Sequence, residues 1–460
     1  MSKQINSDNI LPESMASPLL TRKVVMFPIW FFQCYLTITV IVFAFGPWTW
    51  PVPDPLSLYL FLFCAQFALW FGYRTGLNFN QSGYYGTWRI DSMIKISLML
   101  NLAWIVPNFM LRMNLATLNL SDVLDAIARG FLDPGTNYLS RAAAFSELEK
   151  TPFWGYIALL ISPVLWLLFP LGVVYWNRLT RVMRWIFVFI VVADLLSWVA
   201  IGTNKGIADF VLLLPWLLIA RSPELIADIR PARIFKLLVT VSLGLVLLFG
   251  FFSLGMSGRG HASIPTYDDA AKIGINRDNW IVSLLPSEGQ AAVAMFTSYL
   301  VQGYYALSLA LEEPFVFSYG VGNSYYLTGL VQHFVGEGVV SNKTYPARIE
   351  KYGWDRFNQW HSFYTWIASD VSFPGTIVVV FLIGRLFAMV WLDVLRKNNP
   401  FAVALFALLI IMLFYFPANN QVLAFSGTAN PFFVLLVCWI LTRKRYVVLT
   451  QWRSDSAGTL

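Results

Sequence analysis

The chain has few charged residues, few cysteines and few histidines. Charged side chains make up 12% of its 460 residues, about half of the 25% that is usual in soluble domains. Its three cysteines, Cys34, Cys64 and Cys438, lie inside apolar runs, so we expect no disulfide framework. Its three histidines lack the spacing of zinc motifs such as HExxH, so we expect neither a metal nor a cofactor. We find no internal repeat and no low-complexity tract.

Apolar and aromatic side chains are abundant instead. Hydrophobic residues make up 57% of the chain, with 38 Phe and 19 Trp, which predicts a polytopic membrane protein rather than a globular domain with one anchor. The first apolar run follows Arg22 and Lys23 and is far longer than the hydrophobic core of a secretory signal peptide. The formal charge of +7 does not indicate nucleic acid binding, because the basic residues lie in short loops between apolar runs.

The apolar runs predict an all-α polytopic membrane protein with about ten transmembrane helices. A span needs about 20 mostly apolar residues, and these runs are too apolar on every side for the one-faced helices of a soluble bundle. The expected spans are Val24–Gly46, Pro55–Tyr73, Met93–Leu111, Pro152–Trp176, Trp185–Ile201, Gly206–Ala220, Leu237–Met256, Val371–Leu392, Pro400–Ala418 and Gln421–Thr442.

The distribution of Lys and Arg predicts the orientation. With the N-terminus in the cytoplasm, the basic clusters from Arg22-Lys23 to Arg443-Lys444-Arg445 all fall on the inner side. The opposite short loops, Pro47–Asp54 and Ala418–Asn430, contain no Lys or Arg. We therefore expect both termini inside and residues 257–370, with all three histidines, outside.

Two segments on the outer side are expected to lie at the membrane surface. Ala291–Leu311 is apolar enough to cross and would be an eleventh span, but the basic C-terminal tail would then fall outside. We expect a helix on, or dipping into, the outer leaflet, starting near Ser287. In the second segment, residues 114–151, apolar residues between Ser121 and Phe131 recur at helical spacing, which is typical of an interfacial helix.

These boundaries divide the chain into three parts. Residues 1–256 form an N-terminal bundle of about seven spans, with 114–151 on the outer side. Residues 257–370 form one large outer loop region with short interfacial helices, and residues 371–460 form the C-terminal spans and an inner tail.

Ionisable residues inside or beside the spans are candidates for function, because charge is costly there. Asp194, Asp209 and Arg385 lie within apolar runs, and Asp194 is equally well explained as a buried, hydrogen-bonded carboxyl. Lys205 lies in Gly202-Thr-Asn-Lys-Gly206, a tight turn on the outer side. It is either a snorkelling lysine or a cation held at the membrane surface for a ligand.

The outer loop offers further cations and two glycine-rich turns. Arg259 lies in Ser257-Gly-Arg-Gly-His261, where an arginine can bind a phosphate through two hydrogen bonds, although the same composition makes an ordinary flexible loop. Tyr319-Gly-Val-Gly-Asn323 precedes a helical pattern and is a weak anion-binding signal. Arg348, Lys351 and Arg356 form a basic cluster.

The most specific local pattern begins at His361, at the outer mouth of a span. His361 is a candidate general base, or else a residue of the interfacial aromatic belt beside Trp360. Asp370 follows nine residues later, about two and a half helical turns. It could orient the imidazole only across a bend, such as one at Pro374-Gly375; Asp355 is the other carboxylate considered for that role.

This pattern resembles that of the bacterial oligosaccharide repeat-unit polymerases (O-antigen polymerases, Wzy-type) and their relatives, the O-antigen ligases. Their motif is His-[Asn/Ser/Gln], nine residues, then Gly-x-x-Gly. Here His361-Ser362 precedes Ser372-Phe-Pro-Gly375, with Ser372 in place of the first glycine. The turn at Lys205 is similar to their small-polar-basic-Gly turn, and Asp370–Gly375 is similar to their Asp-Phe-Gly-x-x-Gly. The order of spans and the large loop extend this resemblance over the whole chain.

The resemblance implies glycosyl transfer between two undecaprenyl-diphosphate-linked oligosaccharides on the periplasmic face of the bacterial inner membrane. It implies a base, His361 with Asp370, and cations for the departing diphosphate, which we expect to be Lys205, Arg259, Arg348 and Arg356. Membrane lipid, a chain-length regulator and a flippase are the expected partners, with no nucleic acid. An O-antigen ligase remains an alternative, as does a secondary transporter or flippase of lipid-linked sugars, although transporters usually show internal repeats.

Overall fold

The structure is a computed structural model, and it describes most but not all of the chain. The described residues are 21–78, 89–113, 119–135, 137–138, 152–227, parts of 239–253, 273–276, 278–283, 287–336, 338–396 and 399–456. Within them the regular structure is helical, and the β-structure is limited to an isolated bridge between Trp48 and Ile275. The prediction of an all-α protein is confirmed for this part of the chain.

The described helices follow the expected runs closely. They are α1 (Arg22–Phe45), α2 (Pro55–Asn78), α3 (Ile90–Met113), α4 (Leu120–Leu132), α6 (Pro152–Val174), α7 (Arg181–Val199), α8 (Lys205–Arg221), α9 (Glu224–Ala227), α11 (Trp280–Ser283), α12 (Ser287–Leu311), α13 (Tyr325–Val335), α14 (Tyr345–Arg348), α15 (Phe363–Arg396), α16 (Pro400–Tyr415) and α17 (Ser426–Ser456).

Six of these helices are long and apolar enough to cross a membrane: α1, α2, α3, α6, α7 and α15. The apolar helices α8 and α16 have 17 and 16 residues, fewer than the roughly 20 that a straight span needs. The expected span Leu237–Met256 lies largely outside the described residues. The structure is therefore consistent with a polytopic helical membrane protein, and the number of spans stays a prediction.

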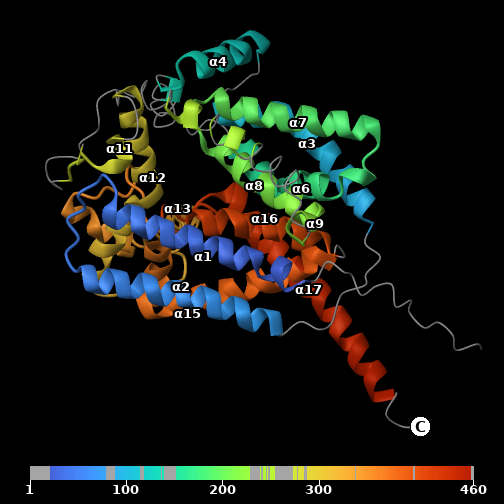
Figure 1. Ribbon diagram of the computed structural model, residues 1–460. Coiled ribbons are helices and arrows are strands. Elements are labelled where there is room, and N and C mark those ends of the chain that lie inside the picture. The colour runs from blue at the N-terminus through green and yellow to red at the C-terminus, as the bar shows by residue number, and fades with distance from the viewer. Residues whose placement is uncertain are drawn as a thin grey trace, which may run out of the picture.

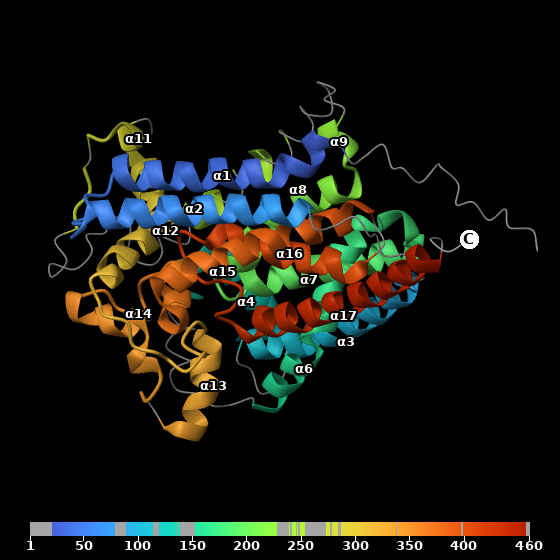
Figure 2. The same cartoon turned by 90° about the horizontal axis from the view of Figure 1, so that it is seen from below.

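Helix α16 lies at the centre of the bundle. Its sequence has no charged residue, and every side chain from Ala402 to Leu413 is buried, as expected for a helix that is apolar all round. It packs against α6, α8, α15 and α17. Figures 1 and 2 show α1 and α2 on one side of it and α3, α6 and α7 on the other.

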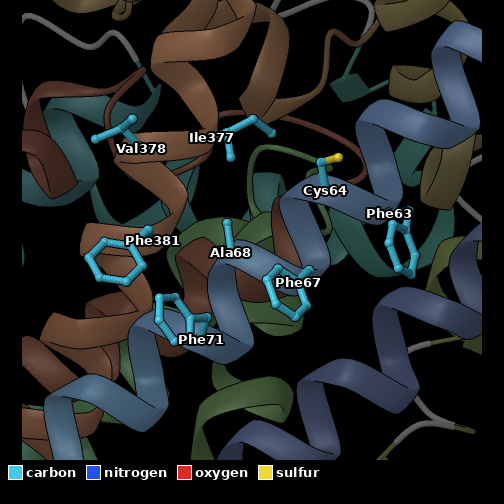
Figure 3. Close-up of a pocket in the computed structure, with 8 residues that line it drawn as sticks. All are labelled: Phe63, Cys64, Phe67, Ala68, Phe71, Ile377, Val378 and Phe381. Carbon is cyan, nitrogen blue, oxygen red and sulfur yellow. The ribbon is translucent and has the colours of Figure 1, made fainter.

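Helices α2 and α15 pack closely because glycines line their contact. A Cβ atom at Gly384 would lie 2.2 Å from the carbonyl oxygen of Leu69, and one at Gly72 would lie 1.9 Å from that of Phe381. Small residues let membrane helices approach in this way. Beside this contact, a pocket of 360 Å³ is lined only by apolar side chains such as Phe63 (Figure 3). Its lining suits hydrocarbon contact.

Contacts between helix termini and loops form one layer at each end of the bundle. At one end Arg178 pairs with Asp91, and the Tyr73 hydroxyl donates to the carbonyl oxygen of Val25. At the other end Trp48 donates to the carbonyl oxygen of Ala294, 2.8 Å away. This second layer, which we call the Lys205 end, is the one predicted to lie outside. Which side of a membrane it faces stays a prediction.

The two expected surface segments both form helices. In α4, Val123 and Ala126 are buried, and the helix packs against α7, while Leu124 and Phe131 remain more than half exposed. Figure 1 shows α4 at the edge of the bundle. Helix α12 begins at Ser287, as predicted, and its second half, Val301–Ala310, is enclosed by protein. It packs against α1, α2 and α15. Its position relative to a leaflet stays a prediction.

Helix α15 contains a break at Ser372. The expected span began at Val371, whereas the helix begins at Phe363 and is interrupted at Ser372, whose φ is +62° and ψ 173°. This backbone region is almost restricted to glycine, and a side chain there costs about 1–3 kcal/mol. Ser372 is also the position at which the resembled motif has its first glycine, so the local geometry gives a reason for that glycine.

We expect Ser372→Gly to stabilise the protein by about 1 kcal/mol, because it relieves the strain at a small entropic cost in the unfolded chain. Ser372→Ala removes the same hydroxyl but keeps the Cβ atom, and it should give no such gain. Thermal unfolding of both variants in one detergent measures the difference. Equal gains in the two variants would show that the hydroxyl, not the backbone, limits stability at this position.

Candidate functional site

A cavity of 790 Å³ lies at the Lys205 end, where α3, α6, α7, α8 and residues 425–428 meet. This volume is within the range of about 300–1,000 Å³ common for small-molecule sites. Along α3 the lining reaches from Asn101 to Arg112, about three helical turns. The cavity is therefore long enough to surround the polar headgroup of a lipid and part of its hydrocarbon tail.

The first charged pair in the cavity is Arg112 with Asp194. Nη1 of Arg112 lies 2.9 Å from Oδ1 of Asp194 and donates to the Ser197 hydroxyl. The guanidinium also stacks on Trp198, 3.8 Å from the ring centre, a cation–π contact. Asn108 donates to the same Oδ1 at 3.2 Å. These contacts join α3 to α7 and fix the direction of both charged groups.

The second pair, Lys205 with Asp209, lies in the first turn of α8. Nζ of Lys205 is 3.0 Å from Oδ2 of Asp209. The preceding turn depends on Gly202, whose φ is +63° and whose Cβ would lie 2.2 Å from the Pro134 carbonyl oxygen. Asn204, the residue before α8, makes no capping hydrogen bond. The Asn204 side chain therefore leaves the first N–H groups of α8 uncapped, and the helix N-terminus adds positive potential beside the Lys205 ammonium.

The cavity is polar at one end and apolar at the other. Its deeper lining includes Trp104, Ile105, Leu168, Phe169 and Leu213. Both cations keep unused donors, since an ammonium has three and a guanidinium has five, while the described contacts use one nitrogen of each. Such a cavity matches a molecule with an anionic head and a hydrocarbon tail.

Asp370 is the anchor of the loop Tyr319–Asn323. Oδ1 accepts from Ser318 Oγ at 2.6 Å and from the backbone N–H groups of Gly320 and Gly322 at 2.9 and 3.2 Å. Oδ2 accepts from the backbone and the side chain of Asn323, both at 2.7 Å. The carboxylate is 8% exposed. The two sequence signals, the glycine loop and Asp370, thus belong to one structure, and the anion that the loop binds is Asp370.

The anchored loop continues to the cavity. Asn420 donates to the carbonyl oxygen of Asn323, and Ser324 donates to that of Leu423. Residues 420–425 lead into the cavity wall, where the Phe425 ring lies 5.6 Å from Nζ of Lys205. Asp370 therefore supports the wall of the cavity through two hydrogen-bonded segments.

His361 is enclosed and lies outside the cavity lining. It is 1% exposed, and neither ring nitrogen has a hydrogen-bond partner among the described residues. Burial lowers the pKa of His361 from 6.5 to about 3, although the nearby Asp355 opposes this shift. The imidazole is therefore neutral at cellular pH and a weak base. The structure does not bring it together with Asp370, whose oxygens are occupied as described.

The cations Arg348 and Arg356 are tied to loop carboxylates. Arg348 Nη2 lies 2.8 Å from Glu313 Oε2, and Lys351 Nζ is 2.6 Å from the other oxygen of Glu313. Arg356 pairs with Glu350 at 2.9 Å. Neither arginine lines the cavity. Of the four expected diphosphate ligands, the structure thus places Lys205 at the cavity.

Other expected features fall elsewhere. Arg259 and His261 lie outside the described residues, and His333 lies on α13. Among the described residues, no three His, Cys, Asp or Glu side chains are grouped as metal ligands would be.

Sequence reasoning missed Arg112, Asn108 and Trp198. Arg112 is one residue beyond the expected span Met93–Leu111, but it lies in the last turn of α3, and Asp194 lies five residues before the end of α7. Two helices separated by one intervening span run in the same direction. A charged residue near the same end of each was therefore a usable signal for a pair.

Comparisons with known proteins add no relative: no family model matches the chain, and no curated protein or solved structure is significantly similar to it.

Proposed function

We propose that this protein is an oligosaccharide repeat-unit polymerase that transfers a glycan from one undecaprenyl diphosphate carrier to a second lipid-linked repeat unit. The observation that carries the proposal is the cavity at the Lys205 end, with Arg112 and Lys205 at its polar end and apolar side chains along its depth. An undecaprenyl diphosphate has the same distribution of charge and hydrocarbon. The motif resemblance at His361–Gly375 and Gly202–Gly206 supports the same reaction.

The chemistry assigns a task to each part of the cavity. The bond between the anomeric carbon and the diphosphate breaks, so negative charge grows on the leaving oxygen, where fixed cations stabilise it most. In this proposal Lys205 stabilises the leaving oxygen, and Arg112, which contacts the same Trp198 ring as Lys205, assists it. The apolar wall around Trp104 and Phe169 accommodates the isoprenoid. Arg259 remains a further candidate ligand from the outer loop.

The proposal includes the cellular setting. The protein lies in the bacterial inner membrane with both termini in the cytoplasm and the Lys205 end at the periplasmic face, as the charge bias of the loops predicts. A flippase supplies the lipid-linked repeat, and a chain-length regulator is a partner during polymerisation.

Deleting the gene in its native host tests the function. Surface glycan should collapse from a ladder to single repeats on the final acceptor, and the wild-type gene should restore the ladder. Full-length polymer retained on its lipid carrier would indicate a ligase instead. Lipid-linked repeats trapped on the cytoplasmic face would indicate a flippase. A flippase is the second candidate function, because ion pairs within the spans, such as Arg112–Asp194, are common in transporters.

A further inference from the structure

Polymerisation needs a group that accepts the proton of the acceptor hydroxyl, and the cavity has two carboxylates. Asp209 holds Lys205 with Oδ2, while its Oδ1 is enclosed. Asp194 differs, because its side chain is 48% exposed within the cavity lining. Among the described residues, its contacts with Arg112 and Asn108 both use Oδ1, so Oδ2 keeps its lone pairs for an incoming hydroxyl.

We propose that Asp194 is the general base of the transfer and that Arg112 is its positioning residue. This inference rests on the proposed function. The acceptor hydroxyl oxygen bonds to the anomeric carbon of the donor glycan while its proton passes to Oδ2 of Asp194. The bond from that carbon to the diphosphate breaks, and its electron pair stays on the diphosphate oxygen near Lys205. No oxidant or further reactant is needed for this balance.

The surroundings of Asp194 favour this role over a purely structural one. Asp370, which has a structural role, is bonded through both oxygens. Within the described part of the chain, the Asp194 carboxylate is bonded through Oδ1 alone, and Arg112 is itself held by Trp198 and Ser197. The free oxygen is therefore fixed in direction, as a base needs to be.

The experiment uses the full chain in nanodiscs, with lipid-linked repeat units as substrate and radiolabelled undecaprenyl diphosphate as binding probe. Asp194→Asn should lower the single-turnover rate about 10²–10⁴-fold and leave probe affinity within about threefold of wild type. Asp125→Asn, the same change on the exposed face of α4, is the matched control and should keep the wild-type rate. In Asp194→Ala, added formate should raise the single-turnover rate at least about tenfold, because a small carboxylate replaces the missing base.

Each other result overturns the assignment. A wild-type rate in Asp194→Asn removes Asp194 as the base. A rate loss matched by an equal loss of probe affinity, without rescue by formate, makes Asp194 structural. A loss in His361→Gln with probe binding retained, and none in Asp194→Asn, returns the role to His361. Failure of the proposed function is seen separately, because the wild-type protein would then form no polymer.

Discussion

The Asp370→Asn variant should lose about 3 kcal/mol of stability, the largest loss expected from any single isosteric change at the Lys205 end. Asparagine presents an NH₂ group where one carboxylate oxygen accepted two hydrogen bonds from Asn323 or the other accepted three from Ser318 and the glycine loop, so one of these sets of donors loses its acceptor. Each buried donor left unsatisfied costs about 1–3 kcal/mol, and more when the lost partner is charged.

The variant should show local opening of the anchored loop as well as a lower free energy of unfolding. Hydrogen exchange and limited proteolysis should detect opening of residues 318–336, and thermal unfolding in detergent should give the stability change. Asp355→Asn is the matched control, since Asp355 caps two backbone N–H groups in the same region with one oxygen and should change stability by less than about 1 kcal/mol. Equal effects of the two changes would contradict the anchoring role of Asp370.

Opening of this loop should also reduce polymer length, because residues 420–425 lose their support. The Phe425 ring would then no longer be fixed beside Lys205. Asp370 is thus expected to act on the reaction by positioning the cavity wall, and probe binding should fall together with turnover. A catalytic role would instead reduce turnover alone.

The Lys205→Gln variant should reduce polymerisation about 100-fold or more. Removing one fixed group that stabilises developing charge commonly costs 10²–10³ in rate, and Lys205 also balances the Asp209 carboxylate. Lys205→Arg keeps the charge and should retain part of the activity. Polymer ladders and single-turnover rates in nanodiscs measure both effects.

The control for this prediction is Lys95→Gln, which removes an exposed lysine near the start of α3, at the end of that helix away from Arg112. It should leave polymer length and rate unchanged. A fall in Lys205→Gln that the double variant Lys205→Gln, Asp209→Asn reverses would show that the lysine only neutralises Asp209, which contradicts a role in diphosphate binding.

The features that sequence reasoning found are local. The spacing of apolar residues and the composition of the loops located α4, α12 and the central bundle. These signals are local, because the pattern that marks a helix lies within a few neighbouring residues. The tight turn at Lys205 and the glycine loop at Tyr319–Asn323 were both singled out as anion sites. Only the structure shows that the second loop already holds Asp370, a residue 47 positions from Asn323.

The features that it missed depend on distant partners. Arg112 and Asp194 are 82 residues apart, and only their shared position near the same end of parallel spans hints at the pair. His361 was placed at an exposed span mouth from its aromatic neighbours, whereas residues brought from α12 and the loop 416–418 enclose that segment, as the packing of Gly303 against Ser362 and Pro417 shows. Burial by distant elements is not encoded in local composition.

The most direct measurement of the central claim is cross-linking of a diphosphate lipid within the cavity. A photoreactive phenylalanine at Phe425 should label radioactive undecaprenyl diphosphate in nanodiscs, and excess unlabelled undecaprenyl diphosphate, but not undecaprenol, should compete. The same group at Phe63, in the apolar pocket beside α2 and α15, should give labelling that does not depend on the diphosphate. Equal labelling from both positions, or equal competition by undecaprenol at Phe425, would contradict a diphosphate site at the Lys205 end.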